Sequence, residues 1–161
     1  GYNHVRTDLE VNIPAGINSG QQIRVSGKGE RGQEGGPNGD LFIEVAIQSH
    51  EFFKRDGNDI HLEVPISFVD AALGIDIDVP TVYGDVSLKI PPGTQPDKVL
   101  KLKGKGVNDL RGGNQGDQYV HLKVATPSNL SKRQKELLEE FKQESGKTES
   151  MFDRFKKFFK T

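Results

Sequence analysis

The sequence predicts a mainly β protein with two tandem β-sandwich-like units, the first of them truncated, followed by C-terminal helices. Its 19 glycines and 8 prolines exceed the combined share of about 12% usual in globular proteins, which favours short strands joined by tight turns. One segment recurs further along the chain. After Pro127 the apolar residues change from an alternating to a helical spacing. We therefore expect three parts, over residues 1–50, 51–126 and 127–161.

The recurring segment organises the chain. Residues 8–45 align with residues 85–122 without a gap, at a constant offset of 77 positions. In the first copy the identical residues are Asp8, Ile13, Pro14, Gly16, Gly27, Lys28, Gly29, Gly35, Gly36, Gly39 and Asp40. The pattern predicts three strands in each copy; in the first copy they are a run over 9–13, a second run closed by Gly27, and a third that begins at Leu41.

Residues 51–84 lie between the copies. They predict a hairpin at Asp56-Gly57, a strand over 60–66, a short helix over 67–73 ended by Gly74, and a strand over 75–79. Because the second copy follows this segment directly, we expect the first unit to need an equivalent. Shifted back by 77 positions, that equivalent would precede Gly1. We therefore expect a first unit that lacks its opening strands and leaves a short edge to be covered.

Two helices are predicted after Pro127. Ser131 and Gln134 fit a capping box, and Gly146 ends that helix. An apolar stripe follows a polar linker and consists of Met151, Phe152, Phe155, Phe158 and Phe159. A helix this short needs a surface on which to bury its stripe. We favour a dimer contact through the four phenylalanines, while packing onto the same chain and a basic amphipathic membrane anchor remain open.

Charge and composition exclude several classes of function. Lys and Arg number 22 against 23 Asp and Glu, so no overall field attracts nucleic acid or a membrane surface. The lack of cysteine excludes disulfides and thiolate metal sites and fits a reducing compartment. No apolar run reaches the roughly 20 residues that span a bilayer. We expect a soluble, cytoplasmic protein without nucleic-acid or membrane partners.

No residue pattern predicts an active site or a metal centre. Residues 27–32 match the dinucleotide pattern G-x-G-x-x-G, but two further glycines and Pro37 follow where a helix should begin, so we interpret the match as a turn. The four histidines are dispersed, and none has the spacing of a metal site. Asp76 and Asp78 alternate with isoleucines, as on the solvated face of a strand. We expect no catalytic residue, no metal ligand and no cofactor.

Phe52 and Phe53 stand together between a strand and a turn, where turn formation does not require large aromatic side chains. Two interpretations are open. In the first, one of the rings covers the core of the first β-unit. In the second, the pair forms the aromatic wall of a shallow apolar groove.

Several motifs together resemble the C-terminal region of bacterial DnaJ-type J-domain co-chaperones. They are V-x-I-P-A-G at 11–16, G-G-P-x-G-D-L-F at 35–42, F-K-R-D-G-N-D-I at 53–60, P-I-S-F-V-D-A-A-L-G at 65–74, R-G-G-x-x-G-D at 111–117 and L-S-K-R-Q-K-E-L-L at 130–138. The likeness runs to about residue 144 and becomes loose in the final tail.

The resemblance implies a groove for unfolded polypeptide on the first β-unit, a dimerising C-terminal segment, and delivery of clients to an ATP-driven DnaK-type chaperone. The phenylalanine that lines the groove corresponds to Phe53, and we add Phe52 as its neighbour. The family's zinc-binding cysteine repeats and the His-Pro-Asp of its J-domain are both absent from this sequence. We therefore expect a non-enzymatic homodimer that binds clients; the alternative is a passive dimerisation scaffold without client affinity.

Overall fold

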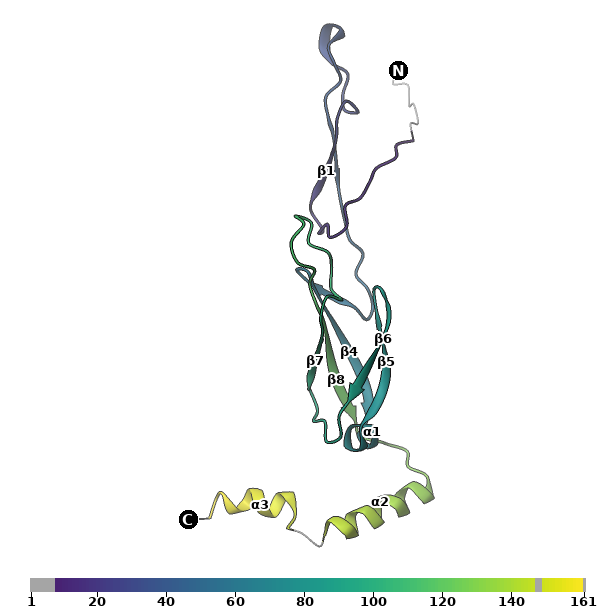
Figure 1. The fold of residues 1–161 in the computed structure, drawn as a ribbon, viewed down its shortest axis with the longest axis vertical. Helices are drawn as coiled ribbons and strands as arrows, with labels where there is room; N and C mark the ends of the chain where they lie inside the picture. The colour runs from purple at the N-terminus through teal and green to yellow at the C-terminus, as the bar shows by residue number, and fades with distance from the viewer. Residues whose placement is uncertain (1–7, 147–148, 161) are drawn as a thin grey trace. The chain divides into compact units, whose positions relative to one another are not determined.

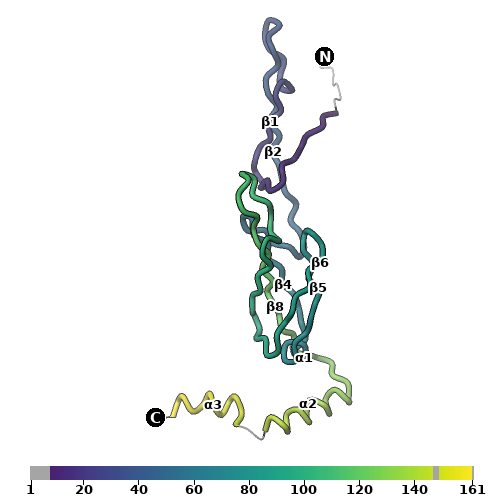
Figure 2. The backbone as a smooth tube through the Cα atoms, viewed as in Figure 1, coloured from purple at the N-terminus to yellow at the C-terminus, as the bar shows by residue number. Residues whose placement is uncertain are grey.

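A computed structural model describes residues 8–146 and 149–160. The chain divides into a β part, up to Val124, and a helical part, from Ala125 onward (Figures 1 and 2). The strands are β1 (Gln22–Val25), β2 (Leu41–Glu44), β3 (Lys54–Asp56), β4 (Asp59–Ser67), β5 (Ile75–Thr81), β6 (Gly84–Ile90), β7 (Val99–Leu102) and β8 (Gln118–Ala125). The helices are α1 (Phe68–Leu73), α2 (Lys132–Ser145) and α3 (Met151–Lys157), with a 3-10 turn over Gln33–Gly35. This content confirms the predicted fold class.

The repeat in the sequence is a repeat in the structure. β1 pairs with β2, and β7 pairs with β8, in the same antiparallel register displaced by 77 positions. The loops also close with equivalent hydrogen bonds. Gly29 N–H donates to Gly39 O at 2.8 Å in the first copy, and its counterpart Gly106 N–H donates to Gly116 O at the same 2.8 Å in the second. Both segments therefore form the same long hairpin, which agrees with the fold that the repeat predicted them to share.

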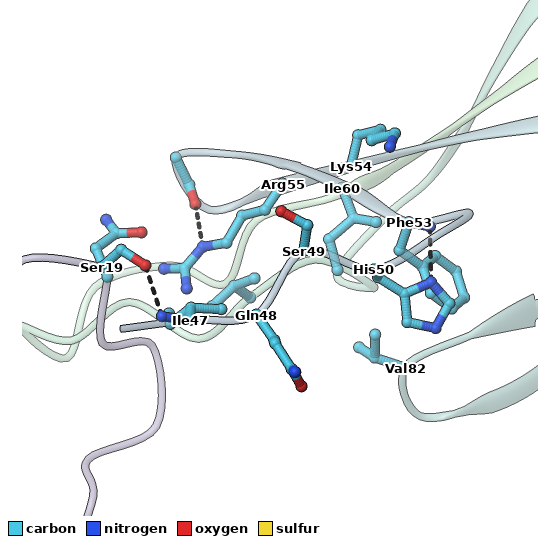
Figure 3. A pocket seen from close by; sticks show the side chains of 13 residues that line it. Ser19, Ile47, Gln48, Ser49, His50, Phe53, Lys54, Arg55, Ile60 and Val82 are labelled. Atoms are coloured by element: carbon cyan, nitrogen blue, oxygen red, sulfur yellow. Dashed lines mark hydrogen bonds between the residues drawn. The ribbon is translucent and has the colours of Figure 1, made fainter. Parts of the chain in front are cut away.

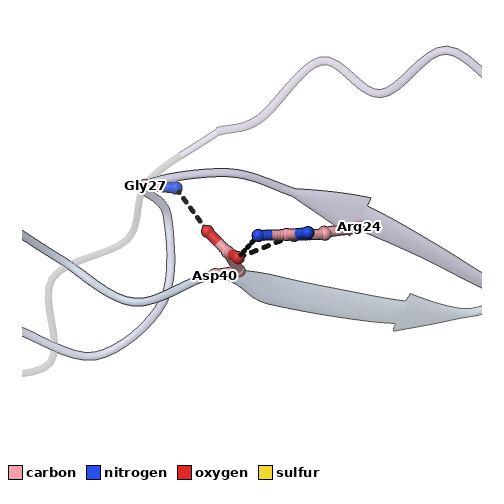
Figure 4. Close-up of polar contacts among 3 residues, drawn as sticks. All are labelled: Arg24, Gly27 and Asp40. Atoms are coloured by element: carbon pink, nitrogen blue, oxygen red, sulfur yellow. Dashed lines mark hydrogen bonds and ion pairs between the residues drawn. The ribbon is translucent and has the colours of Figure 1, made fainter.

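An aspartate just before the second strand closes each hairpin. In the first copy Asp40 accepts the Gly27 N–H at 3.2 Å and forms an ion pair with Arg24 (Figure 4). In the second copy Asp117 accepts the Gly104 N–H at 2.8 Å. Both glycines have a φ of 74°, a backbone conformation that residues with a side chain rarely adopt. The Gly27 N–H, and after it the Arg24 guanidinium, lower the pKa of Asp40 below its ordinary value because both stabilise the carboxylate.

Two layers enclose the core of the β part. One is the sheet with strand order β3-β4-β8-β7, and the other is the hairpin β5-β6. Ile90, Val120 and Leu122 are completely buried between them. The remaining buried residues of this core are Leu62, Ile66, Ala71, Val79 and Leu102. Each layer therefore alternates apolar residues facing the core with polar residues facing solvent.

Helix α1 follows β4 and lies where the sequence predicts it. Ser67 Oγ accepts the Asp70 N–H at 3.0 Å and so caps the first turn. Gly74 N–H donates to Asp70 O at 2.8 Å and closes the last turn. The helix predicted over 67–73 is thus confirmed, with Ser67 as its cap rather than its first residue.

The prediction of a strand over residues 9–13 is wrong. These residues form no strand, whereas their counterparts in the second copy lie in β6 and pair with β5. A strand needs a neighbour to satisfy its backbone groups, and among the described residues no strand lies beside 9–13. Ile13 is accordingly 65% exposed.

The helical part consists of α2 and α3. Ser131 Oγ accepts the Gln134 N–H at 3.1 Å, and the Gln134 side chain accepts the Ser131 N–H at 2.8 Å, which confirms the capping box. Ser150 Oγ caps α3 by accepting the Asp153 N–H at 3.1 Å. Within the described parts of the chain, no helix combines the length and the apolar character that a membrane crossing requires.

Substitution of Gly116 by alanine should distinguish the two hairpins. A Cβ there would lie 1.9 Å from Asn58 O, so the backbone must shift, and we expect a loss of about 1–3 kcal/mol in the free energy of unfolding. Gly39 is the equivalent position in the first copy, and the nearest atom to a Cβ there is Glu30 O at 3.9 Å. Gly39→Ala is the matched control. Its free energy of unfolding, measured in urea, should change by no more than about 0.5 kcal/mol. Equal losses in the two variants would contradict this account.

Candidate binding groove

An open groove of about 510 Å³ lies beside the hairpin formed by β3 and β4 (Figure 3). Its walls come from residues 18–19 before β1, residues 47–50 after β2, the segment 53–60 that includes the β3–β4 hairpin, and two single residues, Val82 and Val107. The apolar side chains that line it are Ile47, Phe53, Ile60, Val82 and Val107. A hollow with this lining suits apolar side chains of a ligand.

Phe53 contributes to the groove and to the core at once. Its half-buried ring packs against the core between the two β layers and also lines the groove. The turn that presents it is held by His50, whose Nδ1 accepts the N–H of Phe52 at 3.0 Å and that of Phe53 at 3.1 Å. The His50 ring also lies 4.9 Å from the Phe53 ring, centroid to centroid (Figure 3). Phe53 thus packs against a core of residues 62–122, which belongs to the second β-unit and not to the first as one interpretation expected, and it also lines the groove.

Phe52 lies in a different hollow. Its side chain is 62% exposed and lines a second groove of about 520 Å³, together with His61 and His121. Because Phe52 and Phe53 line different hollows, these two rings do not form one wall. The structure thus brings Phe53 to the first groove and Phe52 to the second.

Arg55 connects the walls of the first groove, a role that the sequence alone did not indicate. Its guanidinium donates to Ile17 O at 2.7 Å, to Gly16 O at 2.9 Å and to Gly57 O at 2.8 Å. One planar group thereby holds three carbonyls, of which the most distant two, those of Gly16 and Gly57, are 41 positions apart in the chain. The loop before β1 is fixed against the β3–β4 hairpin as a result.

The outer edge of β2 has no strand beside it among the described residues. Val45 N–H donates to Gln21 O at 2.9 Å, toward β1. Because backbone groups alternate in direction along a strand, those of Phe42 and Glu44 point the other way. In the second copy β4 covers the same edge of β8. β2 therefore presents an edge of the kind that accepts an added strand.

The phenylalanines of the C-terminal stripe lie at the surface of the helical part. The Phe152 and Phe155 rings are 6.2 Å apart, and the Phe155 and Phe159 rings meet edge to face at 5.1 Å. Their side chains are 65%, 54% and 72% exposed in that order, and Phe158 is 86% exposed. The structure thus gathers three of the four rings into one cluster that stays open to solvent.

Comparison with known proteins identifies the family. Residues 3–127 match the family model described as the DnaJ C terminal domain, and residues 133–161 match the Chaperone protein DnaJ C-terminal region. The chain belongs to the DnaJ C-terminal domain family. It is 57% identical over 160 residues to the chaperone protein DnaJ of Erysipelothrix rhusiopathiae, covering 99% of this chain and 43% of that protein. It is 54% identical to that of Geobacillus thermodenitrificans, covering 96% of this chain and 42% of that protein. The chain thus spans less than half the length of these relatives.

The structure also tests the predictions about the glycine pattern and the histidines of this DnaJ-family chain. Residues 27–32 lie in the loop of the first hairpin, which confirms that the glycine pattern forms a turn. The histidines, dispersed in the sequence, are not all apart: His61 Nδ1 lies 2.8 Å from His121 Nε2. Over the described ranges, no group of three or more His, Cys, Asp or Glu residues is placed to hold a metal ion.

Replacement of Arg55 by lysine should loosen the first groove. A single ammonium cannot reproduce the three hydrogen bonds of the guanidinium, so we expect the free energy of unfolding to fall by about 1–3 kcal/mol. Amide hydrogen exchange should accelerate in the loop around Ile17. The matched control is Arg133→Lys, because Arg133 is exposed on α2 and pairs with Glu136 at 3.3 Å. Unchanged exchange around Ile17 in Arg55→Lys would show that the guanidinium does not hold this loop.

Proposed function

We propose that this chain is the client-holding part of a DnaJ-type co-chaperone, which binds non-native polypeptide and, as a homodimer, delivers it to a DnaK-type chaperone in the cytoplasm. The observation that carries the proposal is the first groove, in which Phe53 and Ile47 offer apolar surface to a ligand. Membership of the DnaJ C-terminal domain family supports it. The role assigned is binding without catalysis.

Binding would combine strand addition with apolar contacts. An extended client can pair its backbone with the outer edge of β2, as β4 pairs with β8 in the second copy. Backbone hydrogen bonds are independent of sequence, so this part of the contact accepts any client. Alternate client side chains would enter the groove and meet Phe53 and Ile47, and this part of the contact selects for hydrophobicity.

Dimerisation would take place through the open phenylalanine cluster of α3. Phe152, Phe155, Phe158 and Phe159 are all more than half exposed, and a seven-residue helix gains little stability without a partner surface. A second copy of the chain offers a matching apolar surface. A dimer would carry two copies of the first groove, one on each chain. Its avidity for long clients that reach both copies would therefore be higher.

Two variants of the first groove test client binding. Phe53→Ala should at least halve the suppression of aggregation of an unfolded client, because it removes an aromatic wall of the groove. Since Phe53 also packs against the core, Ile47→Ser provides a second test: Ile47 lines the same groove, is 43% exposed, and lies outside the core. The control is Phe141→Ala, which removes an exposed phenylalanine of α2. Full activity of both groove variants would refute the assignment.

Polar substitution of the α3 cluster tests the dimer and the alternative of a passive scaffold. Sedimentation of Phe155→Ser/Phe159→Ser should show a monomer at concentrations where the parent chain is a dimer. Phe42→Ser, which changes an exposed phenylalanine of β2, serves as the matched control and should remain dimeric. In parallel, a permanently unfolded client is titrated against the parent chain. A dimer without measurable client affinity would favour the passive scaffold over our proposal.

A further inference from the structure

Two histidines from neighbouring strands meet on the surface of the β3-β4-β8-β7 sheet. His61 lies on β4 and His121 on β8, and they are 60 positions apart in the chain. Their rings are 5.1 Å apart between centroids, and His61 also stacks on Tyr119 at 5.2 Å with an angle of 17° between the ring planes. The stacking limits how far the His61 ring can turn. The contacts with Tyr119 and His121 therefore restrict the orientation of the His61 ring.

The distance between the facing nitrogens is suited to two ligands of one metal ion. His61 Nδ1 and His121 Nε2 are 2.8 Å apart and share a hydrogen bond, which an ion bound by both nitrogens would replace. Two nitrogens bound about 2.0 Å from one ion at a right angle, as in tetragonal Cu²⁺ or Ni²⁺ sites, are about 2.8 Å apart. In tetrahedral Zn²⁺ sites the same separation is about 3.4 Å, which a small side-chain rotation would reach. Such rotation must also turn both lone pairs toward the ion.

We infer that His61 and His121 form a two-histidine binding site for a divalent transition-metal ion of the class that prefers imidazole nitrogen. The remaining coordination positions are filled by water. Without metal, one facing nitrogen donates its N–H to the other. Metal binding replaces this hydrogen bond: the donor ring changes to its other tautomer through exchange with water, so both rings carry their proton on the outward nitrogen and there is no net proton to remove. This site is separate from the cysteine-based zinc region that the family resemblance implies.

The surroundings of the pair do not oppose a cation. The second groove, which contains both histidines, is lined by the carboxylates of Glu51 and Glu63 and by the ammonium groups of Lys54 and Lys123. Lys123 is itself paired with Asp97 at 2.8 Å. With Asp97 included, three carboxylates face two ammonium groups, so the surroundings carry no excess positive charge. Because the chain has no cysteine, no thiolate competes for the ion.

Metal binding has a structural consequence that can be measured. The two ligands lie on adjacent strands, so an ion that joins them links β4 to β8 in the folded chain and loses one ligand when the strands separate. Thermal unfolding should therefore shift to higher temperature as the metal concentration rises. With two imidazole ligands, Cu²⁺ should bind more tightly than Ni²⁺ or Zn²⁺.

The test is calorimetric titration of the tag-free full chain with CuCl₂, NiCl₂ and ZnCl₂ in a buffer that does not chelate. We expect one high-affinity ion per chain and a Cu²⁺ electron paramagnetic resonance spectrum with two nitrogen ligands. His61→Gln and His121→Gln should each weaken binding at least tenfold, because each leaves a single imidazole. His4→Gln, which also removes one histidine, should bind as the parent chain does.

Circular dichroism without metal establishes that each variant is folded before its titration is compared. Two variants, one on each strand, protect the test against the failure of either one to fold. Binding by the parent chain that is no tighter than binding by a folded His61→Gln or His121→Gln variant would overturn the inference. A loss of metal affinity in His4→Gln as large as in His61→Gln and His121→Gln would also overturn the inference.

Discussion

Strand β8 is the element on which the rest of the β part depends. It lies between β4 and β7 in the sheet, and its Val120 and Leu122 side chains are wholly buried. Gln118, also wholly buried, donates from Nε2 to Pro80 O at 2.9 Å and so connects the sheet to the facing β5-β6 hairpin. A directional bond between layers fixes their relative position more closely than apolar contact alone. The groove, whose floor includes Ile60 of β4, takes its shape from this pairing.

The two hairpin copies share a backbone but differ in their neighbours. The second copy is covered by β4 and packed against β5 and β6, so its strands supply core residues. Over the described residues the first copy has neither neighbour, and Phe42 and Ile47 remain 58% and 43% exposed. Within the described residues, the same local fold is therefore buried in one copy and exposed in the other.

The sequence predicted the helix caps and the glycine turns because each depends on residues a few positions apart, and the repeat predicted that the two copies share one fold. Pairing between strands could not be predicted in this way. The run over 9–13 alternates like a strand but has no partner strand among the described residues, and His61 meets His121 because β4 lies beside β8. The separation of Phe52 and Phe53 into two grooves depends on the bend at residues 51–52, which the sequence did not indicate.

Gly39 and Gly116 are identical in the repeat but differ in their surroundings. Gly116 approaches Asn58 so closely that no side chain fits, whereas the nearest described atom to a Cβ at Gly39 is Glu30 O at 3.9 Å, and Gly39 has no positive φ. Within the described residues, a side chain is therefore tolerated at position 39 and excluded at position 116, although both belong to the same hairpin.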